Sequence, residues 1–163
     1  MFAMIHIGKY AIGKIDWDSD FTYGHRVEFE SIFSAEDTSE YKKMCLAFKA
    51  MYGFTHRLLP MRLRAKVFDK LIRGFKGWID KEQQMLDYSP TEEEKRAGIK
   101  ELSEKVGQMS TIKALAKAYS ADPDEVLKWP YSKVFIILYT DCEERKYEKK
   151  LSKEYERTRN KHR

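Results

Sequence analysis

The sequence predicts a mostly α-helical fold, a helical bundle of about five to six helices with a short extended or β N-terminal arm. Three observations support this prediction. Apolar residues recur at spacings of three and four through most of the 163 residues, and Ser, Thr or Asp caps precede these runs. Only four prolines and eight glycines interrupt them. A chain of this length buries roughly 70% of its unfolded surface, so we expect one domain that folds without a disulfide or a metal.

The first 20 residues are the least helical part of the chain. Met1 to Trp17 carries β-branched and aromatic residues around Gly8 and Gly13, which favours one or two short strands or an extended arm. So little β structure forms no independent sheet, and the arm is therefore expected to pack on the helices or to pair with another copy.

Three aspartates at residues 16, 18 and 20 resemble the start of a calcium loop. Phe21 stands where the sharp-turn glycine belongs, and no glutamate follows at the twelfth position. We therefore expect a turn here and no metal site. Ser19 or Asp20 is the expected cap of a helix over 21–34, whose apolar face includes Val27, Phe29 and Ile32.

Two further helices occupy the middle of the chain. The caps at 37–39 open the first, and Gly53 closes it. A long basic helix is expected from about Met61 to Tyr88. Gly74 and Gly77 lie inside it, and because each costs on the order of 1 kcal/mol relative to alanine, we expect close packing at these positions.

The stretch 89–94 combines a capping serine, a first-turn proline and three acidic residues, which predicts another helix start. The helix that follows has only a narrow apolar edge and is expected to be largely solvated. The residues of this edge are Ile99, Leu102, Val106 and Met109.

The stretch from Ser110 to Cys142 has the clearest start and stop signals. Ser110 is the expected N-cap of a short helix over 111–119, and Asp122 with Pro123 opens the next. Pro130 disfavours helical geometry at Trp129, so the chain must bend there before a longer helix begins.

Positive charge is concentrated at the end of the chain. The net charge is +5, but residues 145–163 hold nine Lys/Arg against three Glu, so the other residues sum to −1. We therefore divide the chain into a single helical domain, 1–144, and a basic, partly helical or disordered tail, 145–163.

Catalytic chemistry finds little support. The four histidines are scattered, and no nucleophile elbow or glycine-rich phosphate loop is present. Cys45 and Cys142 show no zinc-ligand spacing, which is typical of core thiols in a reducing cytoplasm. No targeting segment or membrane-spanning run is seen. We expect a cytoplasmic protein that is not an enzyme and has no cofactor, no metal and no membrane partner.

Binding is the alternative to catalysis. Seven methionines, three tryptophans, ten tyrosines and nine phenylalanines suit a groove that accepts an amphipathic helix. A helix-turn-helix in the 110–142 stretch is disfavoured, because Asp124 and Glu125 would face phosphates with like charge. The basic tail still leaves a nucleic-acid-associated protein open as a less favoured alternative.

One family resemblance is carried by residues 110–147. The pair Leu115-Ala116, the helix start over 122–127, Trp129 and the apolar-charged helix through Phe135 and Leu138 resemble the C-terminal part of small tail assembly chaperones of long-tailed bacteriophages and prophages. The resemblance covers roughly a quarter of the chain. It implies a chaperone, acting in the cytoplasm of a bacterial host cell, that coats a long helical tape measure protein until the tail tube assembles around it.

Under this hypothesis the docking residues are large apolar side chains near the Pro130 elbow and a stripe farther along the last helix. A homo-oligomer stays open, and so does a structural virion component that pairs with its neighbours through the N-terminal arm. The expected partner-binding residues are Trp129, Tyr131, Phe135, Leu138 and Tyr139, with Tyr147, Leu151 and Tyr155 as the extension.

Overall fold

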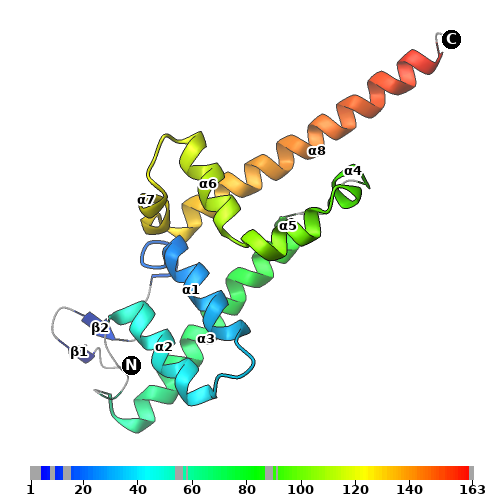
Figure 1. Cartoon of the computed structure of the whole chain (residues 1–163). Coiled ribbons are helices and arrows are strands. Elements are labelled where there is room, and N and C mark those ends of the chain that lie inside the picture. Colours follow the sequence, from blue (N-terminus) through cyan, green and yellow to red (C-terminus); the bar gives the residue numbers. More distant parts are fainter. Residues whose placement is uncertain are drawn as a thin grey trace.

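The computed structural model describes residues 5–7, 10–12, 16–53, 57, 59–86, 90 and 92–161. Within these ranges it contains eight helices and two short strands, which confirms the mostly α-helical prediction (Figure 1). The elements in chain order are β1 (Ile5–Ile7), β2 (Tyr10–Ile12), α1 (Tyr23–Ser34), α2 (Glu40–Tyr52), α3 (Met61–Met85), α4 (Glu92–Arg96), α5 (Ile99–Val106), α6 (Met109–Ala118), α7 (Pro123–Lys128) and α8 (Tyr131–Lys161).

The two strands lie in the segment where extended or β structure was expected. They pair antiparallel with each other, with Ile5 opposite Ile12 and Ile7 opposite Tyr10. The pairing therefore forms a small hairpin within one chain, and the arm uses its own second strand as a partner.

The start of α1 differs from the prediction by two residues. Its N-cap is Thr22 and not Ser19 or Asp20, because a capping box forms between Thr22 and His25. Thr22 Oγ1 accepts from the backbone N–H of His25 at 3.3 Å, and His25 Nδ1 accepts from the N–H of Thr22 at 3.1 Å. Asp16 and Asp20 instead accept backbone N–H groups of the preceding turn.

Helix ends between residues 85 and 110 also differ from the prediction. The long basic helix ends at Met85, where Leu86 turns extended and buried, and residues 87–89 lie outside the described ranges. The expected helix after it is split into α4 and α5, because Gly98 takes a left-handed φ of 79°. This split and the short α7 raise the helix count above the expected five or six.

The predicted N-cap at Ser110 is wrong. Helix α6 begins at Met109, two residues before the expected start, and its N-cap residue is Gln108. Gly107 has a positive φ of 49°, so the chain turns before Ser110 is reached. Ser110 therefore lies inside the first turn of α6, where its hydroxyl donates to the Gly107 carbonyl at 3.1 Å.

The other local signals act as predicted. Gly53 ends α2 with φ 71°, and Asp122 caps α7 by accepting the backbone N–H of Asp124 at 2.8 Å. Trp129 is extended, with ψ 142°, so Pro130 separates α7 from α8. Gly74 lies directly against the indole of Trp17, which confirms the expected close packing at that glycine. The same prediction is wrong at Gly77, where an added Cβ would meet no atom within 4 Å.

The Pro130 elbow is attached to the beginning of α1. Tyr23 N–H donates to the Trp129 carbonyl at 2.9 Å, and Tyr131 N–H donates to the Phe21 carbonyl at 2.7 Å. These two backbone hydrogen bonds form an antiparallel bridge between segments more than 100 residues apart in the sequence. They fix the position at which α8 begins beside α1.

Aromatic side chains form much of the core around this bridge. Phe21 is fully buried and lies within ring contact of Phe29, Phe75 and Tyr131. Trp78 of α3 packs edge-on against Tyr131 with 5.1 Å between ring centroids. The elbow is therefore a junction where α1, α3 and α8 meet.

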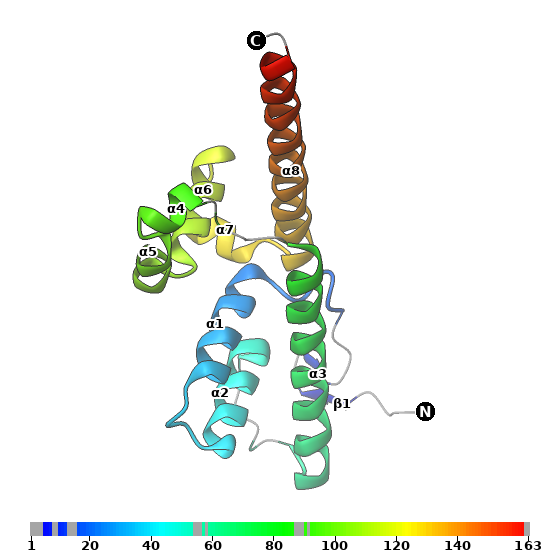
Figure 2. The ribbon, with the colours of Figure 1, turned by 90° about the vertical axis from the view of Figure 1, so that its right-hand side faces the viewer.

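Helix α8 starts in the bundle and then leaves it. In Figures 1 and 2 its C-terminal half extends well beyond the other helices. From Glu143 to Arg159 the side chains are exposed, apart from the half-buried Lys146. Among the described residues, no helix combines the length and the apolar character needed to cross a bilayer.

Candidate functional site

The expected docking residues near the elbow are largely part of the fold's interior. Tyr131 is 1% exposed and Phe135 is 8% exposed, so neither offers a surface to a partner. Leu138 and Tyr139 are partly buried against the same core. Trp129 is half-buried, with Tyr119 edge-on at 5.6 Å and the Lys133 ammonium 4.0 Å above its ring. The elbow therefore serves mainly as a structural junction.

A buried ion pair lies beside this junction. Arg26 of α1, which is 6% exposed, donates from Nε and Nη2 to the two carboxylate oxygens of Glu82 of α3, at 2.9 and 2.8 Å. Its Nη1 donates to Glu30 at 2.6 Å. A bidentate arginine-carboxylate pair is among the stronger hydrogen-bonded contacts in proteins. It connects α1 to α3.

Two tyrosines extend this network to the later helices. Tyr131 of α8 donates its hydroxyl proton to Glu82, and Tyr23 donates to the side chain of Gln108 at 2.9 Å. Gln108 in turn donates to Glu30 at 3.1 Å. The rings of Tyr23 and Tyr131 stack with 6.0 Å between centroids. Four elements are thus joined through one set of hydrogen bonds.

The network keeps its charges and protons in place. Burial alone would lower the pKa of Arg26, but the hydrogen bonds and charges of Glu82 and Glu30 outweigh burial and raise it. Burial raises the pKa of Tyr23 to about 12, and burial together with Glu82 raises that of Tyr131 well above its usual value. None of these groups exchanges a proton near neutral pH, so the network is suited to holding helices together and not to acid-base chemistry.

Sequence reasoning missed this network for a physical reason. Arg26 and Glu82 are 56 residues apart, and each occurs among other charged residues on a predicted helix. No local pattern marks two charges as a future buried pair. The one available signal was that Arg26 lies on the same side of α1 as Phe29, one turn apart.

His25 has a structural role as well. It lines a hollow between α1, α2 and α7, next to Gly24 and Leu127. Burial lowers its pKa, so the ring is neutral near pH 7, and its Nδ1 is engaged in the capping box with Thr22. The lone pair of His25 Nδ1 is therefore not available to act as a general base.

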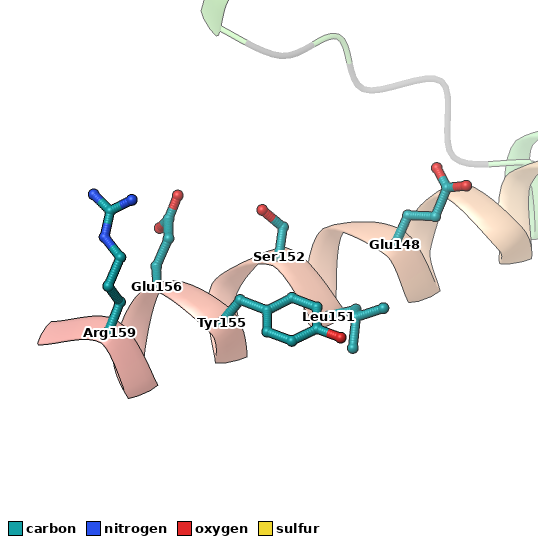
Figure 3. A pocket seen from close by; sticks show the side chains of 6 residues that line it. All are labelled: Glu148, Leu151, Ser152, Tyr155, Glu156 and Arg159. Carbon is teal, nitrogen blue, oxygen red and sulfur yellow. The ribbon is translucent and has the colours of Figure 1, made fainter. Parts of the chain in front are cut away.

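The exposed candidates lie on the projecting half of α8. Tyr147, Leu151 and Tyr155 are 65%, 39% and 68% exposed and recur every fourth residue. We call these three residues the apolar strip. Figure 3 shows the phenol ring of Tyr155 extending along the helix toward Leu151. Large apolar side chains exposed in succession are typical of a surface that meets a partner.

The apolar strip does not continue the buried face of α8. Leu151 follows the buried Tyr131 by 20 residues, which is a rotation of roughly 200° about the helix axis. The strip therefore faces away from the side that packs into the bundle. It forms a second, separate face of the same helix, and none of the bundle's core residues covers it.

Acidic residues border the apolar strip. Glu148 and Glu154 lie roughly 60° to either side of Leu151, and Glu144 lies almost in line with the strip toward the bundle. A pocket on this side of α8 is lined by Glu148, Leu151, Ser152, Tyr155, Glu156 and Arg159 (Figure 3). Apart from Arg159 at its far end, the charges around the strip are negative.

Metal and thiol chemistry find no site in the described part of the chain. No group of three or more His, Cys, Asp or Glu that could hold a metal ion occurs there. Cys45 and Cys142 form no disulfide, and Cys142 is buried. Comparison with protein-family models, with curated proteins and with solved structures gave no match.

Proposed function

We propose that this chain is a non-enzymatic binding protein that holds an amphipathic helix of a second protein against the apolar strip of α8. The observation that carries the proposal is the strip itself, three exposed large side chains on a helix that has left the bundle. Tyrosine and leucine side chains give the area that helix-in-groove contacts use, read at helical spacing.

The borders of the strip specify the partner's chemistry. Glu144, Glu148 and Glu154 favour a helix whose apolar seam is flanked by Lys or Arg, and they oppose one flanked by acids. Three apolar anchors alone give modest affinity, because association first costs about 4 kcal/mol or more of lost freedom. Several copies bound along one long partner would raise the overall affinity through multivalency.

The resemblance of residues 110–147 supports one class of partner. A bacteriophage or prophage tape measure protein is long and helical, and many copies of a small chaperone bound along it would keep its apolar faces covered. Within this proposal the bundle carries α8, the buried network holds α8 at a fixed angle, and the strip makes the contact.

A peptide experiment tests the binding step directly. Two labelled helical peptides with the same apolar seam, one flanked by Lys and one by Glu, are titrated with the full chain by fluorescence anisotropy. The Lys-flanked peptide should bind more tightly. Changing Tyr147, Leu151 and Tyr155 to alanine, which keeps helix propensity, should weaken its binding by about tenfold or more.

A matched variant controls for general loss of apolar surface. Leu102, Val106 and Met109 are also exposed, and changing all three to alanine should leave peptide binding unchanged. Equal loss in both triple variants, or tighter binding of the Glu-flanked peptide, would reject the strip as the site.

The tape-measure identity needs a separate test. The chain is co-expressed with the long heptad-rich reading frame beside its gene and purified at about 0.5 M salt, which screens phosphate contacts but leaves apolar burial intact. A complex that the strip variant does not form supports the phage-tail assignment. Peptide binding without such a complex would keep the binding site and reject that partner.

A further inference from the structure

The side of α8 opposite the apolar strip carries a dense row of positive charge. We call Arg145, Lys146, Lys149, Lys150, Lys153 and Arg157 the basic face. All six residues belong to the projecting half of the helix, and all but the half-buried Lys146 are exposed. Lys149 precedes Leu151 by two residues, a rotation of roughly 200°, so the two faces point in opposite directions.

One acidic residue, Glu156, lies at the edge of the basic face, between Arg145 and Lys149 in rotation. The five members other than Arg145 lie within an arc of roughly 100°, bounded by Lys149 and Lys150, and no acidic residue of the projecting half falls inside that arc. The basic residues of α3 differ, because Asp69 and Asp80 lie among them and Arg73 is paired with Asp69. Segregation of charge is therefore a property of α8 in particular.

Most of this charge is not neutralised within the chain. Among the residues that the structure describes, Arg145, Lys149, Lys150 and Lys153 form no salt bridge. Lys146 pairs with Glu143 at 2.8 Å and Arg157 with Glu154 at 2.6 Å, both at the ends of the row. Exposed pairs of this kind contribute about 1 kcal/mol or less, so a stronger anion can displace them.

We infer that the basic face binds the phosphate backbone of nucleic acid. From Arg145 to Arg157 the helix rises about 18 Å, so its six charges are spaced on average about 3.6 Å apart along the axis. One strand of duplex DNA presents a phosphate about every 3.4 Å. The two charge densities match, and five of the six side chains are exposed to solvent.

The arrangement of α8 disfavours an anionic membrane as the ligand. A helix lying in a membrane surface has its cationic side chains beside its apolar face. Here the apolar strip is on the opposite side and is bordered by Glu148 and Glu154, which anionic headgroups would repel. Contact is expected with phosphates and not with base edges, so binding should be insensitive to sequence and strongly dependent on salt.

The test is a titration of a labelled DNA duplex with the full chain by fluorescence anisotropy, between about 50 and 200 mM salt. Neutralising three central residues with Lys149→Gln, Lys150→Gln and Lys153→Gln should weaken binding at low salt by about tenfold or more. It should also reduce the slope of log K against log salt by about 2.7, which is three phosphate contacts at about 0.9 each.

A control of equal charge separates a site from net charge. Lys66→Gln, Lys70→Gln and Lys76→Gln on α3 remove the same three charges and should leave the slope unchanged. Equal loss in the two triple variants, or no binding of the duplex by the original chain, would overturn the inference. Binding to vesicles that contain phosphatidylserine, without binding to the duplex, would overturn it in favour of a membrane. The variants leave the apolar strip intact, so the result is independent of peptide binding.

Discussion

Two glycines in α3 give a matched pair of substitutions with opposite expected signs. Gly77 has open space where a Cβ would lie, so Gly77→Ala removes only the conformational cost of glycine in a helix. It should stabilise the fold by about 0.5 to 1 kcal/mol. Gly74 differs because a Cβ there would overlap three atoms of the Trp17 indole.

The cost of Gly74→Ala follows from what Trp17 contacts. Its ring packs against the fully buried Phe21 with 5.0 Å between centroids, and the backbone carbonyl of Phe21 accepts the Tyr131 N–H that ties the elbow to α1. Displacing a packed ring by overfilling costs about 3 kcal/mol at the upper end of the usual range. After subtracting the helix gain of about 1 kcal/mol, we expect a net destabilisation of about 2 kcal/mol.

The assay is urea unfolding followed by circular dichroism, with thermal melts as a second measurement. For a chain of this size, 2 kcal/mol corresponds to a fall in Tm of about 6 °C. Removing the indole should reverse the sign, so in a Trp17→Ala background Gly74→Ala should stabilise by about 1 kcal/mol, as Gly77→Ala does. If Gly74→Ala stabilises the original chain, or if the two substitutions at 17 and 74 are additive, Trp17 does not pack on Gly74.

Three further predictions concern the buried network, the cap of α1 and the tail. Glu82→Gln should cost about 3 kcal/mol in urea unfolding because it leaves Arg26 buried without its main counter-charge, and a cost below about 1 kcal/mol would show that the network does not hold the helices. The pKa of His25 is lowered in the fold, so the unfolded chain binds the proton more tightly. The stability that neutral His25 contributes to the fold is fully present above about pH 6.5, and it is lost as pH falls through the lower pKa of the folded state. His25→Gln keeps an acceptor at this position without a titration, and it should flatten this part of the pH dependence. Unchanged pH dependence would contradict the role of His25. Removing residues 145–163 should change Tm by less than about 2 °C because the described side chains there are almost all exposed, and a larger fall would show that the tail packs on the bundle.

Local signals in the sequence predicted most of the secondary structure. Pro130 ended a helix, Asp122 capped one and Gly53 closed one, because each effect depends on a residue's own dihedral angles or on an acceptor within three positions. Predictions failed where two signals competed. Ser110 could have been a cap, but the positive φ of Gly107 placed the turn earlier, and no propensity scale ranks those two outcomes.

The candidate site was predicted in part. The exposed stripe at 147, 151 and 155 could be read from its four-residue spacing and its charged surroundings. Tyr131 and Phe135 looked equally suitable, yet both are buried, because the backbone bridge to Phe21 and Tyr23 turns the start of α8 into the bundle. Nothing within a few residues of Tyr131 distinguishes a core aromatic from a docking one.

The sequence by itself determined that the chain forms helices, where most of them begin and end, and that its positive charge gathers at the end of the last one. Only the tertiary structure decided that Arg26 and Glu82 form one buried pair, that the elbow is interior, and that the apolar strip and the basic face stand free of the bundle. The physical reason is the distance along the sequence over which each effect acts. Capping and periodicity act within one or two turns, whereas burial depends on contacts between segments more than 50 residues apart, such as Arg26 with Glu82 and Phe21 with Tyr131.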